Sequence, residues 1–244
     1  MSHRLKIALL CGLVMLAGHA DAAAPWSYDG DKDYQDNWGI LSPAYTVCET
    51  GVSQSPVQIA ETKIQTLPKL DLRYSNTTGH IHMADHAIRI DVDGKQTLRD
   101  GDKTYHLRYI TFHAPSEHVI KDRFYTMEIE FFHQDKAGEM LILSAFVQEG
   151  APNDVLTLMQ NPQQKELNKE MRFNPASLLP KSRSYYAYTG SLTIPPCTEG
   201  VAWRVLKQPA EATLDQLALL VKHMPRNARV PQPVYMRRIF ESKE

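Results

Sequence analysis

Residues 109–118 read Tyr-Ile-Thr-Phe-His-Ala-Pro-Ser-Glu-His, and after a short link residues 127–133 read Met-Glu-Ile-Glu-Phe-Phe-His. Both runs predict β-strands, because they are short, rich in β-branched and aromatic residues, and bounded by turn-forming residues. Seven of the ten histidines lie between residues 80 and 133. The two strands are expected to bring together the chain's densest set of acid, base and metal-ligand groups: His113, Glu117, His118, Glu128, Glu130 and His133.

Strand patterns continue on both sides of this pair. Alternating or mostly apolar runs predict further strands at residues 70–74, 87–92, 105–112, 125–132, 140–147, 185–192 and 201–207. The run at 140–147 is mostly apolar, which places it near the centre of a sheet. Asp93-Gly94 indicates the turn of a β-hairpin. The sequence therefore predicts a mainly β protein.

Helical patterns are few. Residues 153–160 predict a short helix, and residues 214–223 predict the clearest one, because Thr213 and Gln216 form a capping box at its start. Its buried stripe is expected from Leu214, Leu217, Leu220 and Val221. Gly, Pro, Asp and Ser interrupt residues 25–60 too often for long helices, so this segment is expected to wrap over the sheet as a loop-rich layer.

The first 22 residues predict a signal peptide. Arg4 and Lys6 precede an apolar run over residues 7–16, and small residues follow it. The run is too short for a transmembrane helix, which needs about 20 residues. We therefore expect a periplasmic or secreted protein whose mature chain, residues 23–244, forms one domain without a transmembrane segment.

Charge and cysteine content limit the partners and the compartment. The chain has 27 basic and 28 acidic residues and no basic run, which argues against a nucleic-acid partner. Two cysteines follow the signal peptide, Cys48 and Cys197, and an oxidising compartment favours a disulfide between them; two unpaired buried thiols are the alternative. Closing a loop of this length would stabilise the fold by about 4–5 kcal/mol.

A set of motifs occurs in order along almost the whole mature chain. They are Trp26/Tyr28/Gly30, Trp38-Gly39, Gln54-Ser55-Pro56, residues 112–118, residues 191–200 and Gln232-Pro233. Together they resemble the α-class carbonic anhydrases of the exported bacterial type. The resemblance implies one domain with a mixed, mostly antiparallel ten-stranded central sheet, a few short peripheral helices, and a conical pocket with zinc on its floor. Bacterial members form a disulfide at positions that match the two cysteines.

The family's zinc site has three histidines, two from a His-x-His strand and one from a Glu-x-His pair on the neighbouring strand. Three neutral nitrogen ligands leave an open position, where bound water has a pKa of about 7. The positions that match these ligands are Thr111, His113 and Glu130, so the resemblance implies a degenerate site with one histidine. A threonine hydroxyl is a poor zinc ligand. Carboxylates do bind zinc, which leaves open an altered site on His113 and Glu130.

The residues that support the ligands also differ from the family pattern. Tyr109 stands where a glutamine partners the first histidine, and Glu128 matches the glutamate that orients the third. Glu128 and Glu130 are two residues apart, so both face the same side of their strand. Without a cation they repel, and one should have a raised pKa and hold a proton. The alternatives are a cation between them, or one carboxylate that faces solvent or meets an arginine.

The pocket is expected to be narrower than in the family, because larger side chains stand in its wall. The apolar wall that borders CO2 corresponds to Phe132, Ile142, Leu192, Val201 and Trp203. Phe132 and Ile142 stand where valines are usual, which should reduce the pocket volume. Ile194 stands where a threonine would help position bicarbonate. These changes converge with the ligand changes on a loss of hydration activity.

Some of the family's functional residues are retained. Thr193 and Glu117 match the pair that orients a zinc-bound hydroxide, and a buried hydrogen bond between them would also stabilise the fold. His86 matches the proton-shuttle histidine at the pocket mouth. Residues 79–86 are extra or rearranged and are expected to form a loop at the pocket rim. His80, His82 and His86 on this loop could form a replacement metal site; a solvated histidine-rich loop is the favoured alternative.

The sequence therefore favours an exported carbonic anhydrase-like protein that does not hydrate CO2 efficiently and serves as a binding or scaffold domain. Its partner would be an unknown protein or small-molecule ligand. No cofactor is expected, and zinc only if the altered site binds it. The first alternative is a working carbonic anhydrase with metal on His113 and Glu130, and the second is a different reaction in the altered pocket.

Overall fold

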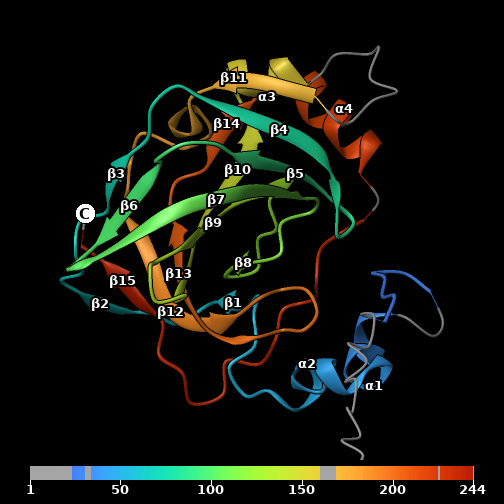
Figure 1. Ribbon diagram of the computed structural model, residues 1–244. Coiled ribbons are helices and arrows are strands. Elements are labelled where there is room, and N and C mark those ends of the chain that lie inside the picture. Colours follow the sequence, from blue (N-terminus) through green and yellow to red (C-terminus); the bar gives the residue numbers. More distant parts are fainter. Residues whose placement is uncertain (1–23, 31–33, 160–168, 225, 244) are drawn as a thin grey trace, which may run out of the picture.

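The computed structural model describes residues 24–30, 34–159, 169–224 and 226–243 of the chain (Figure 1). The predicted signal peptide lies outside these residues. Within them the molecule is built on one large sheet, and ten of its strands follow a single path in the order β11-β4-β5-β7-β9-β10-β13-β12-β15-β2. Three short strands, β3, β6 and β14, pair beside this path. The predicted mainly β fold with a large mixed sheet is confirmed.

The strands have the following bounds: β1 Gln58–Ile59, β2 Lys63–Gln65, β3 Asp71–Arg73, β4 Thr77–Ala84, β5 Ala87–Val92, β6 Thr97–Asp100, β7 Lys103–His113, β8 Val119–Ile120, β9 Met127–Gln134, β10 Met140–Glu149, β11 Lys169–Phe173, β12 Tyr185–Ser191, β13 Glu199–Leu206, β14 Ala210–Ala212 and β15 Phe240–Ser242. The helical elements are short: η1 Gln35–Asn37, α1 Trp38–Leu41, η2 Pro43–Tyr45, α2 Val47–Thr50, α3 Asp154–Met159, η3 Pro175–Leu178 and α4 Leu214–His223. No described helix is long and apolar enough to cross a membrane.

Most neighbouring strands are antiparallel, and the parallel pairs of the large sheet are β10 with β13, β10 with β14, and β15 with β2. Strand β10 lies in the middle of the path and is buried over most of its length. A strand that is covered on both faces needs an apolar run rather than an alternating one. The composition of residues 140–147 predicted this central position correctly.

The two strands of the opening stretch pair as expected. Strands β7 and β9 are antiparallel neighbours, with Thr111 opposite Glu130 and His113 opposite Glu128. The predicted cluster loses one member, because side chains alternate between the faces of a strand. His133 therefore lies on the opposite face from Glu128 and Glu130, where its ring bonds the Tyr74 hydroxyl. Burial there lowers the pKa of His133 to about 3.

The segment around residues 79–86 is a strand and not a loop. Residues 77–84 form β4, which pairs with β5 through a two-residue turn at Asp85 and His86. Both turn residues have positive φ angles, 49° and 64°, as a tight hairpin turn requires. The hairpin predicted at Asp93-Gly94 is wrong: the chain turns there, but β5 pairs with β4 and β7, while β6 pairs with β3 and β7.

Helix α4 has the predicted bounds and the predicted capping box between Thr213 and Gln216. Its predicted buried stripe is only half right. Leu217 and Leu220 are buried, but the side chains of Leu214 and Val221 are 61% and 39% exposed. Leu214 is the first helical residue and Val221 lies beside the main stripe, so both lie at the margin of the packed face.

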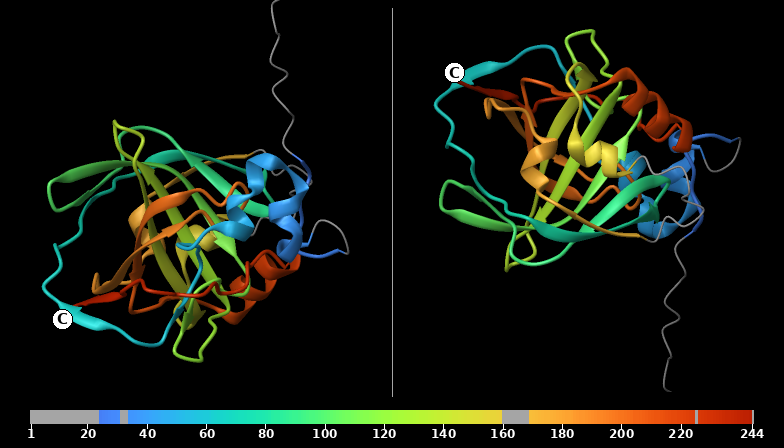
Figure 2. Two further views of the ribbon diagram at one scale, coloured as in Figure 1. Left: turned by 90° about the horizontal axis from the view of Figure 1, so that it is seen from below. Right: turned by 90° about the horizontal axis from the view of Figure 1, so that it is seen from above.

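The N-terminal helices α1 and α2 lie together at one end of the sheet in both views of Figure 2. Trp38 anchors them, because its fully buried ring packs edge-on against Trp26 and Tyr28. Cys48 in α2 forms a disulfide with Cys197, which confirms the predicted pairing. The bond ties this layer to the segment between β12 and β13, which borders the candidate site.

Candidate functional site

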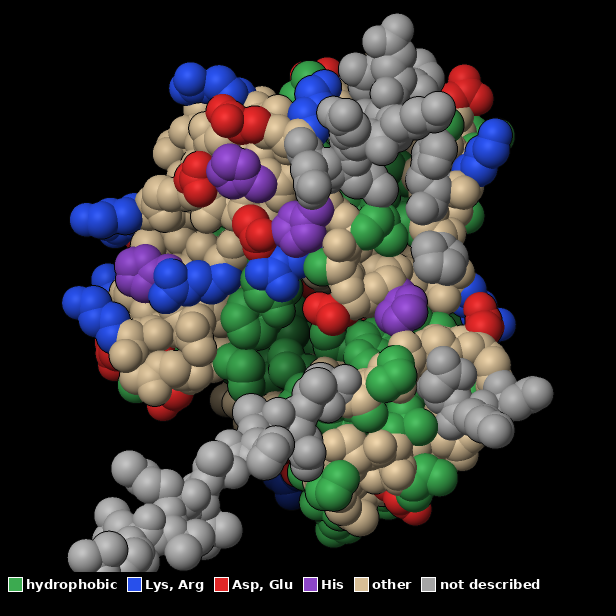
Figure 3. Space-filling view, turned by 45° about the vertical axis from the view of Figure 1, so that its right-hand side comes forward, with side chains coloured by type: hydrophobic (Ala, Val, Ile, Leu, Met, Phe, Trp, Pro, Cys, Tyr) green, Lys and Arg blue, Asp and Glu red, His purple; other side chains and the backbone are tan. Residues whose placement is uncertain are grey.

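A small cavity of about 40 Å³ opens beside the strands that the sequence analysis singled out (Figure 3). Figure 3 shows a hollow with hydrophobic side chains inside and charged side chains on its rim. Its lining comes from the β4–β5 hairpin, from β7, β9 and β10, and from the segment after β12: Ala84, Asp85, Ala87, Arg89, Tyr109, Thr111, His113, Glu130, Phe132, Ile142, Leu192, Thr193 and Ile194. Val201 and Trp203, which were predicted in the wall, are instead fully buried in the adjoining apolar cluster.

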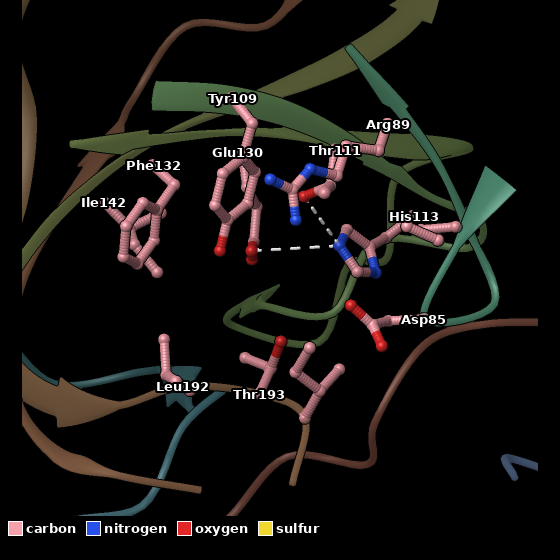
Figure 4. A pocket seen from close by; sticks show the side chains of 13 residues that line it. Asp85, Arg89, Tyr109, Thr111, His113, Glu130, Phe132, Ile142, Leu192 and Thr193 are labelled. Carbon is pink, nitrogen blue, oxygen red and sulfur yellow. Dashed lines mark hydrogen bonds and ion pairs between the residues drawn. The ribbon is translucent and has the colours of Figure 1, made fainter. Parts of the chain in front are cut away.

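The floor of the cavity holds the three positions predicted from the motif. His113 Nε2 lies 3.2 Å from the Thr111 hydroxyl and 3.8 Å from Glu130 Oε2 (Figure 4). His113 and Glu130 are both buried. The strand pairing that aligns Thr111 with Glu130 therefore does bring these groups together, as the sequence analysis expected.

The orientation of His113 is set by a residue that the sequence analysis missed. Its Nδ1–H donates to the backbone carbonyl of Asn227 at 2.8 Å, since a carbonyl can only accept. In the neutral ring, Nε2 therefore carries the lone pair and faces the cavity. The Asn227 side chain also bonds the backbone of Ala114 and Phe112. Asn227 lies in the segment after α4, and no sequence pattern there predicts its contact with His113.

Glu117 lies behind the floor of the cavity and faces the His113 ring. One of its carboxylate oxygens accepts the backbone N–H of Arg229 at 2.8 Å, and the other lies 3.7 Å from His113 Nδ1. Neither oxygen accepts a hydrogen bond from Thr193 in the described part of the chain, so the expected bond between Thr193 and Glu117 is not formed. Thr193 instead lines the cavity.

The two glutamates of β9 differ in their surroundings. Glu128 accepts hydrogen bonds from the backbone N–H groups of Glu117 and His118, from the His118 ring, and from the Ser144 hydroxyl. Burial alone would raise the pKa of Glu128, but the His118 ring and these hydrogen bonds lower it. Glu128 is therefore ionised and belongs to a structural network.

Glu130 has the opposite shift. Burial, then the charges of Glu117 and Glu128, raise its pKa well above the usual value. Its Oε1 is buried and accepts no hydrogen bond from an N–H or hydroxyl group among the described residues. A side-chain hydrogen bond with Glu117, which needs the carboxyl proton, is a further cause of the raised pKa. The direction agrees with the expectation that one carboxylate of the pair holds a proton. The stronger repulsion on Glu130 comes from the charge of Glu117, however, and that from the charge of Glu128 is weaker.

Aromatic stacking narrows one side of the cavity. The Tyr109 and Phe132 rings stack with centroids 4.6 Å apart, and the Arg89 guanidinium lies 3.8 Å above the Tyr109 ring. Arg89 also forms a 2.6 Å ion pair with Asp91 on its own strand, so its charge is compensated at the rim. Burial raises the pKa of Tyr109 to about 12, which keeps its hydroxyl neutral.

The histidines of the β4–β5 hairpin do not converge on the floor. His80 and His82 pair with Asp93 and Asp91, and His86 bonds the backbone carbonyl of Trp26 at 2.8 Å. Among the described residues, the clusters that could hold a metal are His113/Glu117/Glu130 and His118/Glu128/Glu130. The replacement site considered on His80, His82 and His86 is not formed among the described residues, because His80 and His82 face their acidic neighbours and His86 faces the Trp26 carbonyl.

The donor set does not fit a zinc site of three histidines. His113 presents one ring nitrogen, Nε2, which accepts from the Thr111 hydroxyl; Thr111 itself offers only that neutral hydroxyl, and Glu130 offers a carboxyl group with a raised pKa. Zinc hydration catalysts use three strong ligands and keep a fourth position for water. The residues at this floor supply one ligand of that kind.

Three comparisons place the chain among known proteins. The family model "Eukaryotic-type carbonic anhydrase" matches residues 33–243. A carbonic anhydrase of Neisseria gonorrhoeae is 37% identical over 203 residues, covering 82% of this chain and 80% of that protein. The α-carbonic anhydrase of Thermovibrio ammonificans, solved with the inhibitor sulfanilamide, is 34% identical with a TM-score of 0.85, and the match covers 90% of this chain and all (100%) of that chain.

The fold is also found in a protein with a different name. Dioscorin, solved in a complex with ascorbate, is 28% identical with a TM-score of 0.81, and the match covers 90% of this chain and 99% of that chain. The family match spans most of the chain, residues 33–243, and bacterial relatives exceed 30% identity over most of their length. This chain therefore belongs to the eukaryotic-type, or α, carbonic anhydrase family.

Proposed function

We propose that this protein is an exported carbonic anhydrase-like domain that does not hydrate CO2 efficiently and binds a protein or small-molecule ligand. One observation carries the proposal: His113 is the single imidazole among the described residues that line the cavity. Zinc-dependent hydration needs several neutral nitrogen ligands to hold the metal and activate water. A hydroxyl and a carboxyl group occupy the places of the other two.

Two further features of the cavity support the loss of hydration. Phe132, stacked on Tyr109, and Ile142 fill space where a small apolar substrate would need room. Glu117 and Thr193 do not bond each other, so no pair is ready to orient an attacking hydroxide. The dioscorin structure shows that a protein of this fold is able to bind a small polar molecule, which supports a binding role here.

A stopped-flow CO2 hydration assay on the purified mature protein tests the proposal, with and without added zinc. We expect a rate equal to that of the buffer. The Glu170→Gln variant, altered at an exposed residue of β11, serves as a matched control for handling. Stoichiometric zinc together with turnover well above the buffer rate would disprove the proposal.

The alternative is a working carbonic anhydrase with metal on His113 and Glu130. The observation that favours it is the 3.8 Å separation of His113 Nε2 from Glu130 Oε2, with the nitrogen lone pair facing the cavity. The same assay separates the two functions. If this alternative holds, His113→Ala abolishes turnover, whereas under the leading proposal it leaves the rate at the buffer level.

Export to the periplasm or the medium is part of the proposal. The Cys48–Cys197 disulfide supports it, because such bonds persist in oxidising compartments. N-terminal sequencing of protein recovered from a periplasmic or culture fraction tests it. We expect a mature chain that begins near Ala23, and full-length protein confined to the cytoplasm would contradict export.

A further inference from the structure

A second hollow lies away from the candidate site, at the end of the sheet that carries the C-terminal strand β15. It is an open groove of about 710 Å³, lined by residues 67–70, 182–185, 208 and 242–243. None of these residues lines the cavity beside His113. Both views of Figure 2 place the C-terminus at the opposite end of the molecule from α1 and α2. The volume falls within the range of about 300–1,000 Å³ that is typical of small-molecule sites.

Hydrogen bonds hold the walls of this groove together. The Tyr185 hydroxyl donates to the carbonyl of Pro68 at 2.7 Å, and the Tyr185 backbone N–H donates to the Ser242 hydroxyl at 2.8 Å. Tyr185 and Leu70 are buried, and Leu67 packs against the main apolar cluster. Three segments far apart in the sequence therefore form one apolar wall, which is already in place before a ligand binds.

The lining of the groove includes a guanidinium group that lacks an acceptor. Arg183 Nη1 is buried and has no hydrogen-bond partner among the described residues. Burial lowers the pKa of Arg183, and the group that raises it is the Tyr74 hydroxyl rather than a carboxylate. That hydroxyl is already bonded to the His133 ring. A buried donor left without an acceptor costs free energy, and the cost is larger for a charged group. A bound anion would supply the acceptor that Arg183 lacks.

The groove also carries positive charge that no acidic side chain offsets. Lys69 and Lys243 line it together with Arg183, and its described lining contains no Asp or Glu. Glu241, two residues before Lys243, is paired with Lys207 instead. Positively charged groups beside an apolar wall are complementary to a ligand with a negatively charged head and an apolar body.

We propose that this groove binds a small organic anion, in which a carboxylate or phosphate group is attached to an apolar chain or ring. The guanidinium of Arg183 binds the head group, because its planar set of N–H donors fits two oxygens of either group. Lys69 and Lys243, which are exposed, add charge at the mouth of the groove, and the apolar body lies along Leu67 and Leu70. The inference goes beyond the proposed function, because the groove lies apart from the cavity and its ligand does not depend on whether the protein hydrates CO2.

Isothermal titration calorimetry on the mature protein tests the inference with octanoate, octyl phosphate and neutral 1-octanol, which share one chain length. We expect one anion per chain, and we expect 1-octanol to bind at least about tenfold more weakly than the tighter anion, because it lacks the charge. The anion that binds more tightly identifies the head group. Amide shifts in ¹H–¹⁵N NMR spectra locate the site, and they are expected at Leu70 and Ser184. Shifts confined to Thr111 and Glu130 would place the ligand in the other cavity and overturn the inference.

Variants of the basic residues separate this site from unspecific binding. Arg183→Gln should weaken binding of the tighter anion at least about tenfold. Its Tm should be at least that of the parent, because it removes a charge whose buried donor has no partner. The double variant Lys69→Gln/Lys243→Gln, altered only at exposed residues, should weaken binding by about threefold.

The matched control is Lys181→Gln, which removes a positive charge at an exposed residue that does not line the groove. It should bind the anion as the parent does. The inference is overturned if neither anion binds, or if 1-octanol binds as tightly as the anions. It is also overturned if Arg183→Gln keeps full binding, or if Lys181→Gln weakens binding as much as Arg183→Gln does.

Discussion

The His113 ring donates a hydrogen bond to the Asn227 carbonyl at 2.8 Å, and the Asn227 side chain bonds the backbone on both sides of His113. The carboxamide accepts from the N–H of Ala114 and donates to the carbonyl of Phe112, both at 2.9 Å. A segment more than one hundred residues away in sequence therefore fixes the end of β7 and the tautomer of its histidine.

Asn227→Ala is expected to destabilise the fold by about 2–4 kcal/mol, because it leaves a buried N–H and a buried carbonyl without partners. Urea denaturation monitored by tryptophan fluorescence measures the change. Arg226→Ala, at the exposed neighbouring residue, is the matched control and should change the free energy of unfolding by less than about 0.5 kcal/mol. Equal effects of the two substitutions would contradict this role of Asn227.

The strands were predictable because each carries a local pattern. Strand β5 has the predicted bounds, and the apolar run of β10 indicated its central place. The hairpin at Asp93-Gly94 failed because a turn pattern specifies a change of direction and not the partner of the next strand. Strand β6 pairs with β3 and β7, and no local pattern encodes that choice.

The raised pKa of Glu130 predicts that stability falls with rising pH when no metal is present. The folded state holds the proton above the unfolded pKa of about 4.3, where the unfolded chain has released it. The folded state then binds more protons than the unfolded state, so stability decreases from that pH upward through the raised folded pKa. Urea titrations at a series of pH values in EDTA measure this decrease.

Glu130→Gln is the control for the pH effect, since it cannot titrate. Its stability should fall less steeply than that of the parent over the same pH range. Glu128 has a lowered pKa and contributes in the opposite direction, with stability lost as pH falls through its folded pKa. Parallel curves for the parent and Glu130→Gln would show that Glu130 is not the group responsible.

The disulfide should contribute about 4–5 kcal/mol to stability in the chain-entropy model, because Cys48 and Cys197 are 149 residues apart. The double variant Cys48→Ser/Cys197→Ser, compared with the parent under oxidising conditions, measures the contribution by urea denaturation. Reducing agent should lower the stability of the parent and leave the variant unchanged. If reducing agent destabilises the variant equally, the effect does not come from this bond.

The candidate site was predictable only in part. Period-two alternation put Glu128 and Glu130 on one face of their strand, while the grouping of Glu130 with Thr111 and His113 came from the family resemblance; the strand register agrees with both. The same alternation shows why His133 is excluded. The contacts that decide their chemistry come from distant segments. Asn227 orients His113, and Ser144 and His118 bond Glu128. Of the charges that raise the pKa of Glu130, that of Glu117 has the largest effect. Contacts between segments far apart in the sequence cannot be read from periodicity.

Replacing two residues should create a three-histidine zinc site. In Thr111→His/Glu130→His, the new side chains extend from directly paired positions on β7 and β9, beside His113 Nε2, which already faces the cavity. We expect one zinc per chain, bound more tightly than by the parent, and a visible absorption spectrum of four-coordinate Co²⁺ on cobalt substitution. Equilibrium competition with a chelator measures the affinity.

The variant should hydrate CO2 slowly until the cavity is widened, because Phe132 and Ile142 still fill its apolar side. Adding Phe132→Val and Ile142→Val should raise the rate without changing zinc content, which separates metal binding from substrate access. His113→Ala in the same background removes the third nitrogen and is expected to lose zinc. Thr111→His/Glu130→His could instead fold but bind zinc no more tightly than the parent protein does. In that case the three positions do not converge on one ion, and the proposed relation to the family's metal site is wrong.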